Sequence, residues 1–242
     1  MRVIESDVHM QLASPTSADA GLERELKFVM AEARATAALG MLRAVCRPDR
    51  RHATGVVSTI YYDTPSLQLL GEKYDSDYQK LKVRLRWYRA PEDPTGSTKS
   101  FLEVKRRLGA LRDKARIETS LSAQALDDMS LEDPALLAVI LALPSLGFPV
   151  PMPLMPALLL RYRRDRFVEP LSGARVSLDT DIRAVKGKHG LFGAGAGVVL
   201  SAAVLEVKGR ADDLPSVLRP LAHLGARRAS FSKYGMAARA VR

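Results

Sequence analysis

Ionisable side chains occupy every second position in several stretches of this sequence. In LKVRLRWY, residues 81–88, the cations Lys82, Arg84 and Arg86 alternate with apolar residues. Alternate side chains of a β-strand lie on the same face of it. Two like charges about 4 Å apart repel by roughly 4 kcal/mol at an effective dielectric near 20, so this face requires an anionic partner. Guanidinium groups match phosphate oxygens through paired charged hydrogen bonds, which indicates a phosphate compound.

The alternation is repeated in five further stretches. Their ionisable same-face residues are Glu23, Glu25 and Lys27; Glu103 and Lys105; Lys114, Arg116 and Glu118; Arg175, Asp179, Asp181 and Arg183; and Glu206 and Lys208. An antiparallel sheet with one solvated face also produces alternation. A solvated face alone does not explain six strand faces that carry almost only ionisable residues. We therefore infer that the function of the protein requires charge on these faces. Carboxylates among the cations suit phosphate binding if a divalent ion bridges them, and Mg²⁺ or Mn²⁺ does so through oxygen ligands.

The elements that carry these residues follow an α+β pattern. Alternating or β-branched segments predict about eight strands, at 22–30, 56–65, 81–88, 100–107, 114–121, 158–167, 174–184 and 198–209. Helices are expected at 31–45, 122–143, 214–224 and 234–241. Strands and helices do not alternate regularly, so we expect a mostly antiparallel sheet. Closing that sheet into an antiparallel β-barrel would turn the charged faces into a tunnel, with helices around the apolar outside.

The composition indicates a globular protein with an anionic partner. Lys and Arg number 37 against 27 for Asp and Glu, a net charge of +10, which favours nucleic acid, phosphate compounds or a membrane surface. A single cysteine, Cys46, excludes an internal disulfide framework and suits a reducing compartment, so we expect a cytoplasmic protein. The four histidines are dispersed, and they form neither a Cys-His dyad nor a zinc pattern.

One domain is expected over residues 21–242, after a flexible tail at 1–20 that lacks the apolar core of a signal peptide. Residues 135–160 carry no charge over a length that could span a bilayer. Five prolines within them, from Pro144 to Pro156, interrupt helical hydrogen bonding. We therefore expect a short buried helix, an extended proline-rich connector and no transmembrane segment.

Several motifs together resemble a known family. ERELK at 23–27 resembles the ExExK signature of the triphosphate tunnel metalloenzymes, the CYTH-like superfamily. Seven segments follow in order, namely STIYYDTP, KVRLRWY, FLEVKRR, LRYRRDRF, VSLDTDI, VLEVKG and SFSKYGM. Over residues 22–237 this succession resembles the VTC (vacuolar transporter chaperone) domain, the polyphosphate-polymerase branch of that superfamily.

The resemblance implies a basic tunnel that binds a triphosphate and transfers the terminal phosphoryl group of ATP onto a polyphosphate chain. The residues that would hold phosphates and take part in catalysis are Lys27, Arg84, Arg86, Lys105, Arg164 and Lys233. Lys114 and Arg116 fit the tunnel by alternation alone. Glu206 would bind Mn²⁺ or Mg²⁺, with Glu25 and Glu23 as further candidate ligands.

Some assignments stay open at this point. Within RYRRDR the choice of phosphate ligand lies among Arg161, Arg163, Arg164 and Arg166. Glu25, Glu103 and Glu118 could help to hold the metal or pair with neighbouring cations.

Three functions fit the motifs. The first is a polyphosphate polymerase, and the second is a tunnel triphosphatase that hydrolyses inorganic triphosphate or an organic triphosphate. The third is a non-catalytic polyphosphate-binding module, against which Glu206 argues because a pure polyanion binder gains nothing from a carboxylate in its groove. Duplex nucleic acid is too wide for a barrel of this strand number, so we do not expect it as the tunnel ligand. The oligomeric state is not predicted.

Overall fold

The computed structural model describes residues 24–75, 78–90, 99–109, 111–192, 197–210 and 213–242. Its long strands are β1 (Arg24–Ala31), β3 (Thr54–Asp63), β4 (Gln79–Arg89), β5 (Ser100–Leu108), β6 (Leu111–Thr119), β7 (Met155–Val168), β8 (Arg175–Gly187) and β10 (Ala202–Gly209). Its short strands are β2 (Arg47–Pro48), β9 (Val198–Val199) and β11 (Arg227–Arg228). The α-helices are α1 (Ala35–Val45), α2 (Gln68–Asp75), α3 (Ala123–Asp128), α4 (Pro134–Val139) and α5 (Lys233–Ala240). The 3₁₀ helices are η2 (Glu32–Arg34), η3 (Ile140–Leu146) and η4 (Ser216–Leu224).

The described strands form one antiparallel sheet in the order β11-β1-β10-β8-β7-β3-β4-β5-β6, with β2 beside β7 and β9 beside β8. This confirms the predicted α+β class and the mostly antiparallel sheet, and the eight long strands match the eight predicted segments. β2, β11 and α2 were not predicted, and the strand predicted at 198–209 is divided into β9 and β10. The tail expected at 1–20 lies outside the described residues, and the single-domain boundary stays a prediction.

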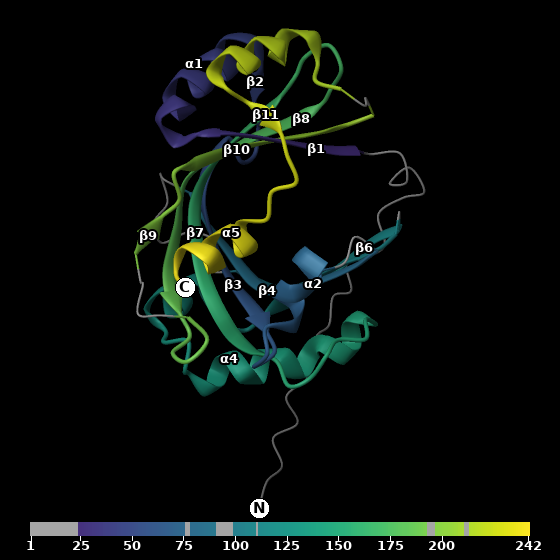
Figure 1. The fold of residues 1–242 in the computed structure, drawn as a ribbon, viewed down its shortest axis with the longest axis vertical. Helices are drawn as coiled ribbons and strands as arrows, with labels where there is room; N and C mark the ends of the chain where they lie inside the picture. Colours follow the sequence, from purple (N-terminus) through teal and green to yellow (C-terminus); the bar gives the residue numbers. More distant parts are fainter. Residues whose placement is uncertain (1–23, 76–77, 91–98, 110, 193–196, 211–212) are drawn as a thin grey trace, which may run out of the picture.

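The predicted closed barrel is wrong, because among the described residues the strand order ends at β11 and at β6, and no backbone pairing joins these two ends. The sheet instead curls, so that β1 and β10 lie opposite β4 and β6 (Figure 1). The gap between the two edges of the sheet, called the opening below, is bridged by side chains. Lys105 Nζ on β5 lies 3.4 Å from Glu25 Oε2 on β1. The chain after β11 also lines the opening, since Ala229 N donates to Lys27 O at 3.0 Å.

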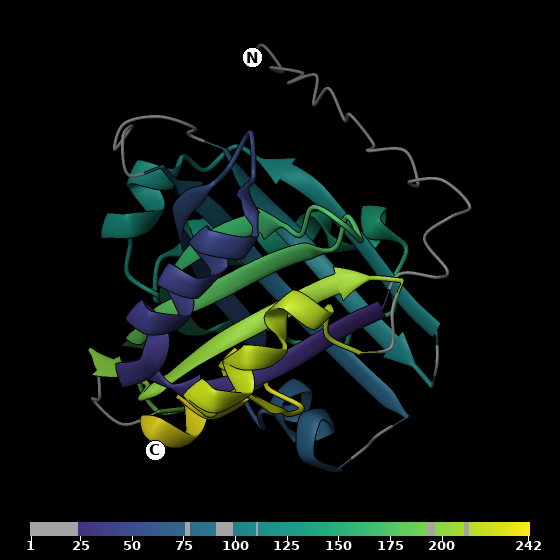
Figure 2. The ribbon, with the colours of Figure 1, turned by 90° about the horizontal axis from the view of Figure 1, so that it is seen from above.

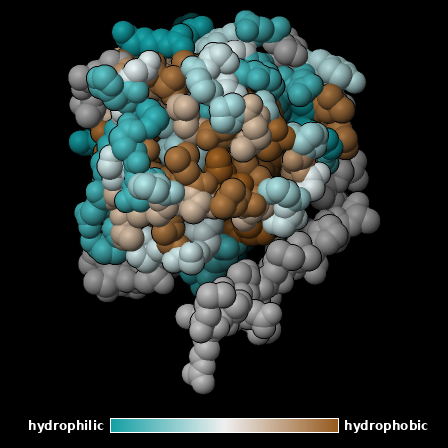
Figure 3. Space-filling model, turned by 90° about the horizontal axis from the view of Figure 1, so that it is seen from below, coloured by the Kyte–Doolittle hydropathy of each residue, from teal (hydrophilic) through white to brown (hydrophobic). Residues whose placement is uncertain are grey.

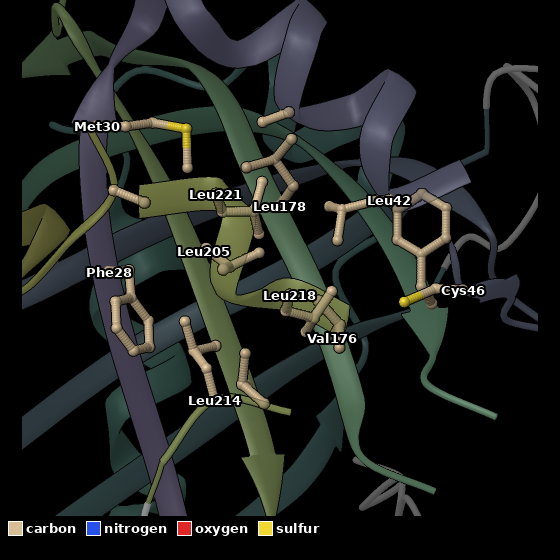
Figure 4. Close-up of a cluster of buried hydrophobic side chains, with 14 of the residues drawn as sticks. Phe28, Met30, Leu42, Cys46, Val176, Leu178, Leu205, Leu214, Leu218 and Leu221 are labelled. Atoms are coloured by element: carbon tan, nitrogen blue, oxygen red, sulfur yellow. The ribbon is translucent and has the colours of Figure 1, made fainter. Parts of the chain in front are cut away.

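The convex side of the sheet is apolar and covered by helices, as the alternation predicts. On β1, β10 and β8, side chains such as Phe28, Leu205 and Leu178 pack beneath α1 and η4 (Figures 2 and 4). On β3, β4 and β5, a second buried cluster packs beneath α3, α4 and η3. Leu85 and Trp87 of that cluster are fully buried. These strands therefore direct apolar residues outward beneath the helices, whereas a third buried cluster, with Leu160 and Tyr162 of β7 and Tyr234 of α5, lies on the concave side.

Asp127 fixes α3 to this convex side. Its Oδ1 accepts from Trp87 Nε1 at 3.0 Å and from Arg161 Nη2 at 2.7 Å, and its Oδ2 accepts from Arg89 Nε at 2.6 Å. One carboxylate thus accepts hydrogen bonds from three side chains on two strands. Because the indole N–H of Trp87 has an acceptor, its ring can be buried in the core.

The uncharged segment 135–160 begins with helix, as predicted. Asp133 caps α4 by accepting from Ala135 N at 2.8 Å, and Pro134 occupies the first turn. α4 and η3 are only partly buried, since Leu137 and Leu141 are exposed. α4 lies at the lower end of the molecule in Figure 1, and the view from below shows a patch of apolar surface (Figure 3). No helix in the described ranges has the length and apolarity needed to cross a membrane.

The C-terminal helix α5 packs inside the curl of the sheet. Tyr234 stacks on Tyr61 of β3 with ring centroids 4.8 Å apart, and its hydroxyl donates to Asp63 Oδ2 at 2.8 Å. The Asp63 carboxylate also accepts from Leu69 N and Leu70 N at the start of α2. Asp63 therefore ties α5 to the end of β3, which fixes the first turn of α5 within the curl.

The predicted placement of side chains fails in the middle of β8. Asp181 has a φ of 49°, and the register with β7 shifts between Arg161 and Arg163. A bulge of this kind inserts a residue and reverses the alternation. Ile182 is consequently buried, whereas Asp181 and Arg183 form an exposed ion pair of 2.7 Å. Their predicted position on the charged face is wrong.

Candidate functional site

The concave side of the sheet, called the inner face below, gathers the ionisable residues. Cross-strand register places the following on it: Glu25, Lys27, Lys80, Lys82, Arg84, Arg86, Glu103, Lys105, Arg107, Arg112, Lys114, Arg116, Glu118, Arg164, Arg166, Arg175, Asp179, Glu206 and Lys208. Directly opposed residues on neighbouring strands share a face, so each pair in the register extends the same charged surface.

Glu206 on β10 forms the centre of a buried ion-pair network. Its Oε1 lies 3.1 Å from Lys27 Nζ and 3.4 Å from Lys233 Nζ, and its Oε2 lies 3.1 Å from Arg164 Nη2. Asp179 on β8 adds a second carboxylate, 2.5 Å from both Arg164 Nε and Lys233 Nζ. Two carboxylates thus hold three cations that come from β1, β7 and α5.

The charge state of this network is set by its ion pairs. Burial alone would raise the pKa of Glu206, but Lys233 and Lys27 outweigh it and hold the pKa well below its usual range. Burial likewise opposes ionisation of Glu25, yet Lys27 and Lys105 lower its pKa to about 2. Both carboxylates therefore remain ionised at neutral pH, which keeps the partner lysines charged.

The opposite wall carries Arg84 and Arg86 of β4. Arg84 Nε lies 2.7 Å from Glu103 Oε2 on β5. Arg86 is buried, and it donates to Thr59 Oγ1 at 3.1 Å and to the Tyr162 hydroxyl at 3.4 Å. The Tyr162 ring also contacts two cations of the Glu206 network, with centroid distances of 4.9 and 5.5 Å. Tyr162 thus links the two walls of the site through a hydrogen bond and cation–π contacts.

A cavity of about 400 Å³ opens onto the inner face. Its cationic lining residues are Lys27, Lys80, Lys82, Lys105, Arg107, Arg112 and Arg228. Glu25 is the carboxylate of the lining, and Leu26 and residues 229–232 complete it. Seven cations against one carboxylate create a positive potential that suits an anion with several charges.

Lys82 has no carboxylate partner among the residues that the structure describes. Its Nζ contacts Ser232 Oγ at 3.4 Å, and this hydroxyl caps α5 by accepting from Gly235 N at 3.2 Å. Burial, with repulsion from Lys27 and Arg84, lowers the pKa of Lys82 to about 7. Near neutral pH the amine is therefore partly uncharged, and a bound anion would restore its charge.

Replacing Lys82 should change how stability depends on pH. The unfolded chain keeps the lysine proton up to its ordinary pKa of 10.5, whereas the folded protein loses it near pH 7. The folded state is therefore disfavoured below about pH 7, and this penalty disappears as the pH rises to about 10.5. We expect Lys82→Met to stabilise the unliganded protein by up to about 5 kcal/mol at pH 6 and by less than about 1 kcal/mol at pH 10.

Urea unfolding at both pH values measures this difference. Lys99→Met is the matched control, because Lys99 is exposed and pairs with Glu118 at 2.9 Å. It should change stability by less than about 0.5 kcal/mol at either pH. An equal gain from Lys82→Met at both pH values would contradict the low pKa.

The structure brings most of the predicted site residues together. Those that lie around the two walls and the cavity are Lys27, Arg84, Arg86, Lys105, Arg164, Lys233, Glu25 and Glu206. Lys114 and Arg116 lie on the inner face but are exposed on the edge strand β6, where Arg116 covers the Phe101 ring at 4.7 Å. Glu23 lies outside the described residues.

Within RYRRDR the strand geometry places Arg164 and Arg166 on the inner face and the other two arginines off it, so the choice of phosphate ligand stays a prediction between these two. Arg164 points into the Glu206 network. Arg161 contacts Asp127 on the convex side, and Arg163 pairs with Asp165 at 3.0 Å. The carboxylates left open are likewise paired: Glu103 with Arg84, and Glu118 with Lys99.

Several residues of the site were not assigned a role from the sequence, among them the cavity cations Lys80, Lys82, Arg107, Arg112 and Arg228. Asp179 was placed on the charged face but not selected, although it pairs with Arg164 as closely as any carboxylate in the site. Tyr162 lies two positions before Arg164 on the same strand, so alternation could have placed it inside.

The fold and the site define an α+β protein whose curled antiparallel sheet encloses a strongly cationic interior. The model of the VTC domain family matches residues 22–242. The chain therefore belongs to the VTC domain family, as its motifs indicated. A search of the curated proteins finds no match.

Three solved structures are similar to this chain over most of its length. The PH1819 protein of Pyrococcus horikoshii OT3 is 13% identical, with 88% of this chain and 97% of that chain covered and a TM-score of 0.46. A protein of Bacillus halodurans, provisionally assigned as an adenylate cyclase, is 15% identical, with 87% and 92% covered and a TM-score of 0.49. A Vibrio parahaemolyticus protein with the same provisional assignment is 17% identical, with 87% and 94% covered and a TM-score of 0.41.

Proposed function

We propose that this protein is a polyphosphate polymerase-type phosphotransferase that moves the terminal phosphoryl group of ATP onto a polyphosphate chain. The proposal rests on the cavity lining, in which seven cations accompany one carboxylate. A triphosphate and a phosphate chain both carry charge on successive units, so they complement a cavity of this sign. Membership of the VTC domain family supports phosphate chemistry, and the motifs resemble the polymerase branch.

In the proposed reaction, an oxygen of the terminal phosphate of the chain attacks the γ-phosphorus of ATP. The bond from that phosphorus to the β,γ-bridging oxygen breaks, and ADP leaves with the electron pair. The attacking oxygen is already anionic at neutral pH, so no side chain has to remove a proton. Catalysis then depends on positioning and charge neutralisation. The groups proposed to hold phosphate oxygens are Lys27 and Lys105, which line the cavity, and Arg84, Arg86, Arg164 and Lys233, which lie in the two walls outside its lining.

The carboxylates of Glu25 and Glu206 would bind a divalent ion, Mn²⁺ or Mg²⁺, only if phosphate oxygens supplied further ligands. Glu25 Oε1 and Glu206 Oε1 each lie 3.1 Å from Lys27 Nζ, so one ammonium group lies between the two carboxylates. Within the described ranges, no three His, Cys, Asp or Glu side chains gather as a metal site. Mg²⁺ often takes one or two carboxylates and completes its shell with substrate phosphates and water. Glu206 and Glu25 would hold such an ion, which supplies charge neutralisation at the phosphate oxygens.

The product formed from ATP distinguishes this function from its rivals. We expect the pure protein, incubated with ATP and Mn²⁺, to produce a ladder of phosphate chains on a gel. Release of free phosphate without a ladder would identify a triphosphate hydrolase. If ATP stays intact while polyphosphate binds, the protein is a non-catalytic binding module.

A further inference from the structure

A second group of cations lies outside the cavity, at the C-terminal end of α1, on β2 and in the loop after β2. Arg43, Arg47, Arg50 and Arg51 are all exposed. Within the part of the chain that the structure describes, none of these four guanidinium groups forms an ion pair or a side-chain hydrogen bond. This set, called the outer arginine cluster below, differs from the inner network, where carboxylates accompany the cations.

The acid nearest in sequence does not neutralise the cluster. Asp49 Oδ1 accepts from the backbone N atoms of Arg51 and His52, at 2.9 and 2.8 Å. Its carboxylate therefore shapes the loop. Four guanidinium groups remain within nine residues of chain, and arginine forks are well suited to phosphate oxygens.

Arg166 connects this loop to the inner face. It follows Arg164 by two positions on β7 and pairs in register with Ser177 of β8. Arg166 Nη1 donates to His52 O at 3.2 Å, and Asp49 N donates to Arg166 O at 2.9 Å. Burial and the neighbouring charge of Arg164 lower the pKa of Arg166, as expected for a cation crowded by another. The inner row of cations thus continues to the base of the outer arginine cluster.

We propose that the outer arginine cluster binds a linear polyphosphate chain that passes from the inner face along Arg166. The inference rests on the proposed function, since a chain held at one end for phosphoryl transfer must leave the cavity as it grows. A flexible chain with a charge on each phosphate can contact successive guanidinium groups without a shaped pocket. The cluster would then strengthen the binding of long chains and contribute nothing to the binding of a free triphosphate.

Single-stranded nucleic acid is the less suitable occupant of this surface. Proteins that bind it combine cations with exposed aromatic side chains on which bases stack. The large aromatic side chains exposed in the described ranges are Tyr74 and Tyr78, which lie on α2 and just after it. None lies within residues 34–53. A surface of arginines alone favours an anion without bases.

Binding of two probes, long-chain linear polyphosphate and tripolyphosphate, tests the outer site without relying on turnover. We expect Arg50→Glu with Arg51→Glu to weaken binding of the long chain about tenfold or more. Binding of tripolyphosphate should stay within about twofold of the unmodified protein. The control is Arg34→Glu with Arg219→Glu, which makes the same change in net charge at exposed positions on η2 and η4.

The outcomes separate the outer site from the proposed function. Equal weakening by the control pair, or no weakening by the cluster pair, overturns the outer site and leaves the cavity unaffected. The outer site is also overturned if the unmodified protein binds both probes equally well. Binding of single-stranded DNA as tight as that of polyphosphate would assign the cluster to nucleic acid instead. If neither phosphate probe binds, the proposed function fails as well.

Discussion

Tripolyphosphate should raise the melting temperature of this protein, and the rise should depend on Arg84 and Arg86. A ligand at about 100 times its dissociation constant stabilises a fold by about 2.7 kcal/mol, which corresponds to roughly 5–10 °C for a chain of this size. Arg84→Ala with Arg86→Ala removes two guanidinium groups from one wall of the site. Charged hydrogen bonds contribute about 1.5–3 kcal/mol each, so the shift should nearly vanish at the same ligand concentration.

Arg183→Ala is the matched control, because it removes an arginine that lies outside the inner face. Arg183 is exposed beyond the bulge in β8 and pairs with exposed Asp181. This variant should therefore preserve the full shift, measured from its own unliganded melting temperature. A full shift in the Arg84 and Arg86 double variant would contradict the assignment of these side chains.

Loss of the Glu206 carboxylate should have the largest effect on the unliganded fold. Glu206 accepts from Lys27, Lys233 and Arg164, and Glu206→Gln would leave these cations short of a buried counter-charge. Removing one partner of a buried ion pair commonly destabilises a protein by about 3–5 kcal/mol. We expect a loss of that size in urea unfolding, together with loss of turnover of ATP.

Glu118→Gln provides the comparison, because Glu118 lies on the exposed edge strand and pairs with exposed Lys99. Its effect on unfolding should stay within about 0.5 kcal/mol. If the Glu206 variant keeps full turnover, neither the metal assignment nor the role of the network in positioning cations can stand.

Local alternation was sufficient to predict which side of most strands is charged. In LKVRLRWY, Val83, Leu85 and Trp87 are fully buried beneath helices, while Arg84 and Arg86 lie inside. This succeeds because the side-chain period of a strand is fixed, so a stretch without bulges keeps its faces over its whole length.

Features that depend on several strands at once could not be predicted in the same way. The bulge at Asp181 reverses the alternation within β8, and no residue pattern before it marks the shift. The opening between β1 and β6 depends on the curvature of the whole sheet and on the chain after β11. Non-local geometry of this kind leaves no period in the sequence.

The charge state of single side chains also depends on distant partners. Lys82, Arg84 and Arg86 looked equivalent in sequence, but they have different environments. Arg84 pairs with Glu103, whereas Lys82 meets only the Ser232 hydroxyl among its described contacts. That hydroxyl comes from a segment 150 residues away, so only the folded chain distinguishes the lysine from its neighbours.

Calorimetric titration of the protein with tripolyphosphate tests most directly whether the inner cavity binds a triphosphate. At about pH 8 the low pKa of Lys82 leaves its amine mostly neutral, and a bound anion should return its proton. In two buffers of different ionisation enthalpy, we expect one tripolyphosphate per chain and about one more proton taken up than in Lys82→Met. Equal proton uptake in both proteins would contradict the low pKa of Lys82. Absence of binding heat in the unmodified protein would contradict a triphosphate site in this cavity.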